Sequence, residues 1–327
     1  MRFLFIASLL AWLAVGACVS GDKGGRDGDR LVIYNAGSLA RPLAAALDTF
    51  ARREGIRVAQ ENLGSLEAAR KLTELGQPPD LIALADHEVF PQLLMPEHTR
   101  WYIQFARNRM VIAHGPRSRG VATLDTARWW ETLLANGVEV GRADPDLDPA
   151  GYRAILVMRL AEEHYQRPGL AQRLLERAPT RNIRPKSAEL TGLLQAGELD
   201  YVWVYQSVAR AARIPYIPLP PEIDLGEAEH AARYARVEVR VHGRTRGDTA
   251  IFRGEPILYA MSIPERAANP RLAERLIAFL MSDEGVDILR AQALEVIRPP
   301  LLVGEDPPPV VRALLAPRTP ASPPAER

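Results

Sequence analysis

The residues best suited to chemistry lie in the segment Asp144–Arg153, whose sequence is DPDLDPAGYR. Its three aspartates precede Pro149, which favours the first position of a helix because its missing N–H would have no partner there. The start of a helix presents free backbone N–H groups and a partial positive charge, which attract anions. Aspartate is also a common helix cap. By itself, the segment therefore predicts either a plain cap or part of an anion site.

Two glycine–serine pairs add to the second interpretation. Gly37-Ser38 and Gly64-Ser65 each follow a predicted strand and open a predicted helix. Glycine lets the backbone approach a ligand closely, and serine at a helix start either caps the helix or binds an oxyanion. Ala150 and Ser187 lie at two further helix starts, and Tyr205 adds a phenolic hydroxyl. Together these groups predict a pocket for a small tetrahedral dianion, bound by dipoles without a counter-charge.

The elements that must position these residues alternate between strand and helix. Hydrophobic periodicity predicts strands at 31–34, 58–62 and 81–85 and helices at 39–50 and 66–75. This alternation predicts a mostly parallel sheet with helices on both faces. Further along the chain, we expect helices at 128–134, 156–175, 187–195 and 272–280 and strands at 110–113, 201–205, 235–242 and 256–263.

Composition argues against several classes of function. The 327 residues contain 41 Lys and Arg against 40 Asp and Glu, a balance that is not typical of a nucleic-acid-binding protein. The sequence lacks the GxxxxGK, GxGxxG, HExxH and GxSxG motifs, and its six histidines do not pair at the helical spacing of metal ligands. Because no residue stands out as a nucleophile, we expect a binding protein and not an enzyme.

The N-terminus indicates export from the cytoplasm. Met1-Arg2 precedes an apolar run at 3–17, which is typical of a signal peptide, and Cys18 is the only cysteine. The sequence VGAC at 15–18 resembles a bacterial lipoprotein cleavage box, which predicts a signal peptide at 1–18 and a lipid on Cys18. Ordinary cleavage nearby, with an incidental cysteine, is the alternative. The small polar segment 19–29 is predicted to be a flexible tether.

The chain also resembles a known family along residues 31–302. The matching pieces include AGSL at 36–39, PPDLIALAD at 78–86, WYIQFARNRMVIA at 101–113, DPDLDPAGYR at 144–153 and GELDYVWVYQSVA at 197–209. They resemble the molybdate/tungstate-binding proteins that serve ABC importers, and most closely their archaeal tungstate-binding branch. The resemblance implies an α/β fold of the type II periplasmic binding protein class, in which two α/β lobes are joined by a two-strand hinge.

On this resemblance, we expect one lobe to comprise residues 30–111 and 214–303 and the other to comprise 112–213. Residues 304–327 are rich in proline and are predicted to be a disordered tail. The positions that match the family's oxyanion-binding residues are Ser38, Ser65, the Ala150 backbone, Ser187 and Tyr205.

The resemblance to the archaeal branch further implies that a pair of carboxylates binds the metal itself and expands its coordination from four toward six. Asp148 matches the first carboxylate. The second is expected at position 187, which is serine in this chain. Either Glu189 substitutes for it, or Asp148 alone coordinates, because residues two apart do not share a helix face.

The implied function is capture of tungstate or molybdate between the lobes and delivery to the permease of an ABC importer. We expect a periplasmic monomer that is anchored to the membrane through a lipid on Cys18 and that needs no cofactor. Three alternatives stay open. They are a binding protein for sulfate, phosphate or a small organic acid, a sensor domain, and an extracytoplasmic phosphate-ester hydrolase that uses Asp148 and Ser38.

Overall fold

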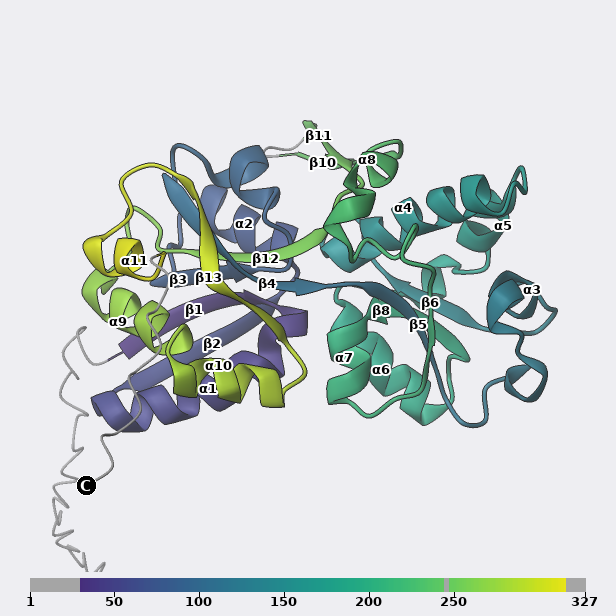
Figure 1. The fold of residues 1–327 in the computed structure, drawn as a ribbon, viewed down its shortest axis with the longest axis horizontal. Helices are drawn as coiled ribbons and strands as arrows, with labels where there is room; N and C mark the ends of the chain where they lie inside the picture. The colour runs from purple at the N-terminus through teal and green to yellow at the C-terminus, as the bar shows by residue number, and fades with distance from the viewer. Residues whose placement is uncertain (1–29, 244–246, 316–327) are drawn as a thin grey trace, which may run out of the picture.

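The computed structural model describes residues 30–243 and 247–315, which form two lobes that lie side by side (Figure 1). Each lobe is built around one β-sheet whose faces are covered by helices, so the structure has the α/β architecture predicted from the sequence. The predictions for residues 1–29, including the signal peptide, the tether and the lipid on Cys18, lie outside the described residues. Among the described residues, the structure contains no helix with the length and apolar character that a membrane span requires.

The first lobe contains a six-stranded sheet with the order β13-β4-β12-β3-β1-β2. Its strands are β1 (Arg30–Ala36), β2 (Arg57–Leu63), β3 (Leu81–Leu84), β4 (Trp101–Asn108), β12 (Ile257–Ser262) and β13 (Glu295–Gly304). Its helices are α1 (Ala40–Glu54), α2 (Ser65–Thr73), α9 (Pro270–Leu280), α10 (Asp283–Ala291) and α11 (Pro309–Ala313). Strands β1, β2 and β3 are parallel, as the alternation of strands and helices predicts.

The sheet is mixed, and the expectation of a mostly parallel sheet is wrong for its other half. Strand β12 pairs antiparallel with both β3 and β4, and β13 pairs antiparallel with β4. The reason lies in the path of the chain. Strand β4 leads out of the first lobe, whereas β12 returns to it from the second lobe, so the two must run in opposite directions (Figure 1).

The second lobe contains a five-stranded sheet with the order β7-β6-β8-β5-β9. Its strands are β5 (Met110–His114), β6 (Val140–Ala143), β7 (Ile183–Arg184), β8 (Tyr201–Tyr205) and β9 (Tyr216–Pro218). Its helices are α3 (Trp129–Leu133), α4 (Pro149–His164), α5 (Leu170–Glu176), α6 (Ser187–Ala196) and α7 (Gln206–Ala211). The single helix predicted at 156–175 is divided into α4 and α5, because Pro168 cannot continue a helix and Gly169 adopts a φ of 80°.

The chain crosses between the lobes twice. Arg109 alone separates β4 from β5, and residues 219–256 return the chain through α8 (Ala231–Tyr234) and the hairpin of β10 (Glu238–His242) and β11 (Thr249–Arg253). The lobe boundaries expected at 111/112 and 213/214 lie a few residues from these crossings. Met110 and Val111 pair with β8, and β9 pairs with β5, so both belong to the sheet of the second lobe.

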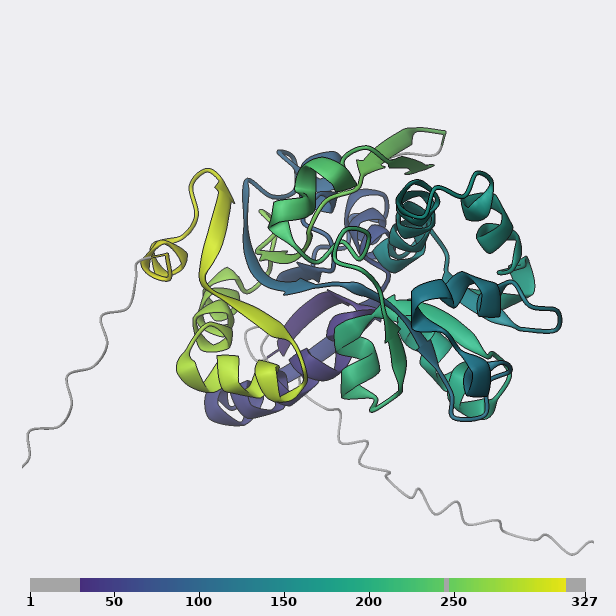
Figure 2. The same cartoon turned by 45° about the vertical axis from the view of Figure 1, so that its right-hand side comes forward.

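The C-terminal segment is folded further than its composition suggests. The prediction of a disordered tail from 304 is wrong for residues 305–315, because α11 packs against α9 and its Val311 is fully buried. Pro309 occupies the first turn of α11, where proline is tolerated. In Figure 2, β13 and α11 lie at the outer edge of the first lobe, away from the second lobe.

Candidate functional site

The first turn of α2 in the first lobe meets the loop before α4 in the second. The carbonyl of Leu147 accepts hydrogen bonds from the backbone nitrogens of Leu66 at 3.2 Å and Glu67 at 3.4 Å. This approach requires glycine at position 64, since a Cβ there would lie 2.1 Å from the Leu147 oxygen. The two lobes are therefore in direct contact at a helix start, as the Gly64-Ser65 pair predicts for a site of close approach.

A second contact joins the turn at Gly37–Leu39 to the start of α6. A Cβ at Gly37 would lie 3.6 Å from the Cβ atoms of Lys186 and Ala188. Beside this contact, a cleft of about 160 Å³ lies between the lobes and is lined by residues that include Ser38, Ala188 and Ser207. Both glycine–serine pairs thus face the second lobe.

Asp148 caps two helices at once. Its Oδ1 atom accepts a hydrogen bond of 2.9 Å from the Ala150 nitrogen in the first turn of α4. Its Oδ2 atom accepts hydrogen bonds from the backbone nitrogen of Ser187 at 2.8 Å and from the Ser187 hydroxyl at 3.0 Å. The carboxylate therefore occupies backbone donors at the starts of both α4 and α6, which are positions that attract anions.

The environment of Asp148 disfavours its charge. Only 3% of the residue is exposed. Burial raises the pKa of Asp148, although the donors at Ser187 and Ala150 and the positive charge of Arg153 oppose that shift. Gly151 allows the close packing of α4 that produces this burial, since a Cβ there would lie 2.6 Å from the Ala143 oxygen.

Arg153, one turn further along α4, forms a buried ion pair between the lobes. Its Nη2 atom lies 2.9 Å from Oδ2 of Asp86, and both side chains are only 2% exposed. Its Nη1 atom donates to the Ala85 carbonyl at 2.6 Å and to the Tyr205 hydroxyl at 2.8 Å. The Tyr152 hydroxyl also donates to Asp86. Each charge is thus paired and hydrogen-bonded, which a buried charge requires.

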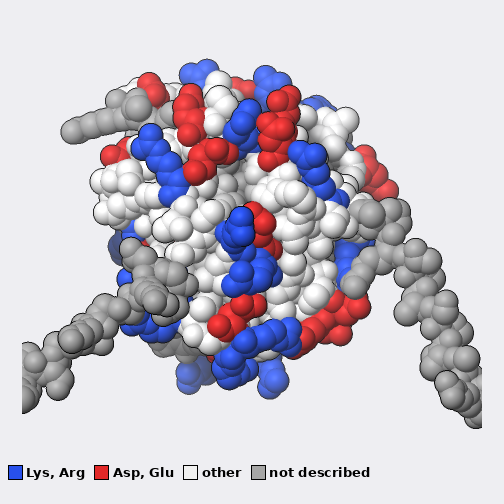
Figure 3. All heavy atoms as spheres, turned by 90° about the vertical axis from the view of Figure 1, so that its left-hand side faces the viewer, with Lys and Arg blue, Asp and Glu red and all other residues white. Residues whose placement is uncertain are grey.

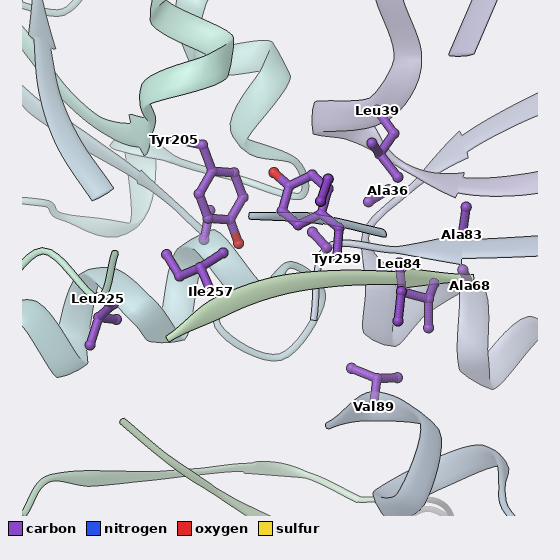
Figure 4. Close-up of a cluster of buried hydrophobic side chains, with 14 of the residues drawn as sticks. Ala36, Leu39, Ala68, Ala83, Leu84, Val89, Tyr205, Leu225, Ile257 and Tyr259 are labelled. Atoms are coloured by element: carbon purple, nitrogen blue, oxygen red, sulfur yellow. The ribbon is translucent and has the colours of Figure 1, made fainter. Parts of the chain in front are cut away.

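Both predicted serines of the first lobe connect to this network. The Ala85 nitrogen donates to the Ser65 hydroxyl at 3.0 Å, so Ala85 links Ser65 to Arg153. The Tyr259 hydroxyl donates to the Ser38 hydroxyl at 2.9 Å. The rings of Tyr205 and Tyr259 lie next to each other, with centroids 5.7 Å apart, and their hydroxyls lie between the lobes (Figure 4).

The structure brings six of the predicted residues together at the boundary between the lobes, all of them buried. They are Ser38, Ser65, Asp148, Ala150, Ser187 and Tyr205. Glu189 is not among them. Its side chain is 41% exposed and pairs with Lys186 at 3.3 Å, one turn back along the surface of α6. The role of all seven residues in ligand binding stays a prediction.

Three further residues belong to this cluster and were not singled out from the sequence. Arg153 lies inside the DPAGYR segment, so its presence beside Asp148 could have indicated a counter-charge. Asp86 and Tyr259 gave no such signal, because each lies at or within an apolar strand and reaches the site only through tertiary packing.

Comparison with known proteins identifies relatives of the chain as a whole. Residues 31–294 match a family model described as a bacterial extracellular solute-binding protein. A solute-binding protein of Petrotoga mobilis is 40% identical over 271 residues, which cover 83% of this chain and 84% of the relative. A molybdate/tungstate-binding protein of Pyrococcus abyssi is 34% identical over 335 residues, which cover 93% of this chain and 96% of the relative.

Solved structures share the fold. The periplasmic molybdate-binding protein of Azotobacter vinelandii matches with a TM-score of 0.57 at 16% identity, covering 82% of this chain and all of that one. A sulfate-binding protein of Mycobacterium tuberculosis matches with a TM-score of 0.55 at 12% identity, covering 87% of this chain and 89% of that one. At such low identity the likeness supports the two-lobed fold and not a choice of ligand.

Proposed function

The chain belongs to the bacterial extracellular solute-binding protein family, and on this premise we propose that it captures tungstate or molybdate between its lobes for an ABC importer. The observation that carries this proposal is the buried cluster at the boundary, to which the first lobe contributes Ser38 and Ser65 and the second contributes Ala150, Ser187 and Tyr205. The 34% identity to a molybdate/tungstate-binding protein over 93% of the chain supports the same ligand class.

Binding in this cleft uses the helix starts of both lobes. The starts of α2, α4 and α6 direct partial positive charge at the boundary, which favours a dianion without a full counter-charge. For their N–H groups to bind the ligand, the Leu147 carbonyl and the Asp148 carboxylate must give up hydrogen bonds that they accept here. A ligand that touches both lobes binds the closed form more tightly than the open form and so shifts the population toward closure. The transporter would then recognise the closed form. Binding, and not turnover, is the proposed activity.

Asp148 is proposed to bond to the metal atom of the oxyanion. A carboxylate next to a dianion is repelled unless it is protonated or bonded to the metal, and a high-valent metal favours hard oxygen ligands. Ser187 occupies the place of the second carboxylate expected from the archaeal branch, and Glu189 lies exposed on the surface of α6. We therefore propose Asp148 as the carboxylate that coordinates, with Glu189 reaching the metal only if α6 reorients.

The proposed importer is supported by the family, and the proposed lipid anchor is supported by the sequence VGAC at 15–18. We propose that a lipid on Cys18 holds the monomer at the outer side of a membrane, where it hands the oxyanion to the permease of an ABC importer. On the face drawn in Figure 3, acidic and basic side chains are interspersed, which is consistent with the balanced composition and with a protein that does not bind nucleic acid. No resident cofactor is part of the proposal.

Isothermal titration of the purified protein with tungstate, molybdate, sulfate and phosphate tests the proposed function. We expect tungstate and molybdate to bind at one site with a Kd lower than that of sulfate by about two orders of magnitude, or roughly 2.7 kcal/mol. Cavity size would supply this selectivity, since the four anions have similar shape. Equal affinity for sulfate, or turnover of a phosphate ester that is lost in Ser38→Ala, would contradict the proposal.

X-ray absorption spectroscopy of the tungstate-loaded protein tests the coordination. More than four oxygen atoms around the metal, with one fewer in Asp148→Asn, would support a bond from Asp148. Four equal oxygen atoms in both proteins would show that the oxyanion stays tetrahedral and that Asp148 acts only as a helix cap.

A further inference from the structure

A second cluster of ionisable side chains lies where β3 ends and β12 begins. Asp86 and His87 follow β3, Glu255 precedes β12, and the antiparallel pairing of these strands brings the three residues together. The His87 nitrogen donates to the Leu258 carbonyl at 3.1 Å, which anchors the turn to β12. One potential metal-ligating atom from each of Asp86, His87 and Glu255 lies within 4.8 Å of the other two.

The imidazole of His87 directs one ring nitrogen toward the two carboxylates, as a histidine that shares a metal with them would. Its Nδ1 atom points between two carboxylates, 3.8 Å from Oδ1 of Asp86 and 3.6 Å from Oε1 of Glu255. These distances are too long for hydrogen bonds, and Nδ1 is buried without a hydrogen-bond partner among the described residues. The residue as a whole is only 8% exposed. A buried nitrogen without a partner carries an energetic cost that a bound ligand would remove.

The other ring nitrogen faces a carboxylate, as the second nitrogen of a metal-bound histidine usually does. Nε2 of His87 lies 3.4 Å from Oε1 of Glu88. Histidines that bind metals usually direct their second ring nitrogen at a carboxylate or carbonyl, which fixes the tautomer and leaves the first nitrogen free to coordinate. With a proton on Nε2 facing Glu88, the lone pair of Nδ1 faces Asp86 and Glu255.

The two oxygens of Asp86 have different neighbours. Oδ2 is held by Arg153 and Tyr152 on the side of the oxyanion cluster. Oδ1 accepts one hydrogen bond, from the Glu88 nitrogen at 2.9 Å, and keeps a second lone pair on the side of His87. Asp86 therefore can serve both clusters, with Arg153 bound to one oxygen and a cation bound to the other.

The charges in this cluster do not balance. The carboxylates of Asp86, Glu88 and Glu255 lie within 3.8 Å of the ring nitrogens of His87. Among the described residues, Arg153 is the cation that pairs with this group, and it is bound to Asp86. A further cation would offset the remaining negative charge.

We propose that Asp86, His87 and Glu255 bind a divalent transition-metal cation, with Zn²⁺ as the reference ion, at a site separate from the oxyanion site. One imidazole nitrogen and two carboxylate oxygens suit Zn²⁺ and its neighbours better than Mg²⁺ or Ca²⁺, which prefer oxygen ligands. Three protein ligands leave a position for water. The Glu255 and Glu88 side chains are 28% and 34% exposed, which opens the site to solvent.

Titration of the chelator-treated protein with ZnCl₂, without oxyanion, tests this site. We expect one Zn²⁺ per chain, with an affinity that falls by more than about 100-fold in His87→Ala and in Glu255→Gln and by about 10- to 100-fold in Glu88→Gln, which removes only the orienting partner. His230→Gln is the matched control, because His230 also lies beside a carboxylate, Glu229 at 3.7 Å, but is not part of a three-ligand group among the residues that the structure describes. Its Zn²⁺ affinity should equal that of the unchanged protein.

The absorption spectrum of bound Co²⁺ gives a second readout that does not depend on affinity alone. We expect a visible band that is lost in His87→Ala and altered in Glu255→Gln. If His87→Ala does not fold, Glu255→Gln carries the test, since its side chain is partly exposed. Failure of the unchanged protein to bind Zn²⁺ would overturn the proposal, and so would equal binding by the Glu255→Gln protein. Tungstate binding is measured separately, so either proposal can fail alone.

Discussion

The carboxylate of Asp148 and the first residue of α6, Ser187, are joined by two hydrogen bonds although 39 residues separate them in the chain. Oδ2 of Asp148 accepts both, from the backbone nitrogen at 2.8 Å and from the hydroxyl at 3.0 Å. A side chain that already caps its own helix thus caps a second one. The proposed oxyanion would therefore meet a carboxylate that is already hydrogen-bonded to the starts of both α4 and α6.

This arrangement predicts a large effect of Asp148→Asn on tungstate binding. If the carboxylate bonds to the metal, the amide should weaken tungstate binding at least about tenfold, or roughly 1.4 kcal/mol, by isothermal titration. Glu189→Gln is the control, because it makes the same chemical change at the exposed first turn of α6 and should leave the Kd unchanged. Unchanged or tighter binding by Asp148→Asn would show that the carboxylate is not a ligand.

Gly64→Ala is predicted to prevent closure without weakening the fold. The φ of −69° and ψ of 149° at Gly64 are accessible to alanine, but its Cβ would lie 2.1 Å from the Leu147 oxygen of the other lobe. We expect tungstate affinity to fall more than about tenfold and the radius of gyration from small-angle scattering to stay large with tungstate present. Gly192→Ala, in α6 with open space around it, should close normally. Normal affinity in Gly64→Ala would contradict the contact.

Arg153→Met is predicted to destabilise the protein strongly. It leaves Asp86 buried without its cation, a change that costs about 3–5 kcal/mol. Urea unfolding without added oxyanion or metal measures this loss. Arg159→Met, at an exposed position of the same helix, should change the free energy of unfolding by less than about 0.5 kcal/mol. A loss below about 1 kcal/mol in Arg153→Met would mean that water reaches the Asp86–Arg153 pair.

Asp224 is predicted to make stability depend on pH. Burial raises the pKa of Asp224 to about 6 from an ordinary 3.8, so the folded state favours the protonated carboxyl. Asp224 therefore stabilises the fold fully below pH 3.8, and this stabilisation is lost as the pH rises through 6. The free energy of unfolding of Asp224→Asn, relative to that of the unchanged protein, should therefore rise by up to about 3 kcal/mol between pH 4 and pH 7. Urea unfolding at the two pH values measures the gain.

Asp125→Asn serves as a control of opposite sign. The pKa of Asp125 is lowered by its hydrogen bond from Arg128, so that carboxylate stabilises the fold at higher pH. A change in the same direction for both variants would show that the measured pH dependence does not come from Asp224.

Local sequence patterns are sufficient to predict the elements that have one strong marker, such as an apolar run or a terminal glycine. The strands at β1, β3 and β8 are short apolar runs, and α1 ends where Gly55 adopts a left-handed φ of 68°. Strand β6 was missed because it has four residues, one of them Gly141. A Cβ at Gly141 would lie 2.6 Å from the Cδ1 atom of Leu199, so a larger residue there would have to displace that side chain.

The candidate site is only partly predictable from the sequence, because some of its contacts depend on tertiary packing. Helix starts are visible in the sequence, so Ser38, Ser65 and Ser187 could be proposed as donors. The partners that complete the network lie far away in the sequence. Tyr259, which donates to Ser38, lies on another strand of the same lobe, and Asp86, which pairs with Arg153, lies in the other lobe. The exposure of Glu189 likewise depends on how α6 packs, which spacing along the chain does not determine.

The crossing at Arg109 brings both connections between the lobes to one place. Only this residue separates β4 from β5, and the return crossing is tied to the same point, because the Met110 nitrogen donates to the Asp224 carbonyl at 2.8 Å. Both connections therefore share one pivot. Rotation about a pivot separates atoms in proportion to their distance from it. If the lobes open about this pivot, as the proposed function requires, the rim farthest from Arg109 parts widest. We therefore expect the anion to enter and leave through that rim and water near the pivot to exchange last.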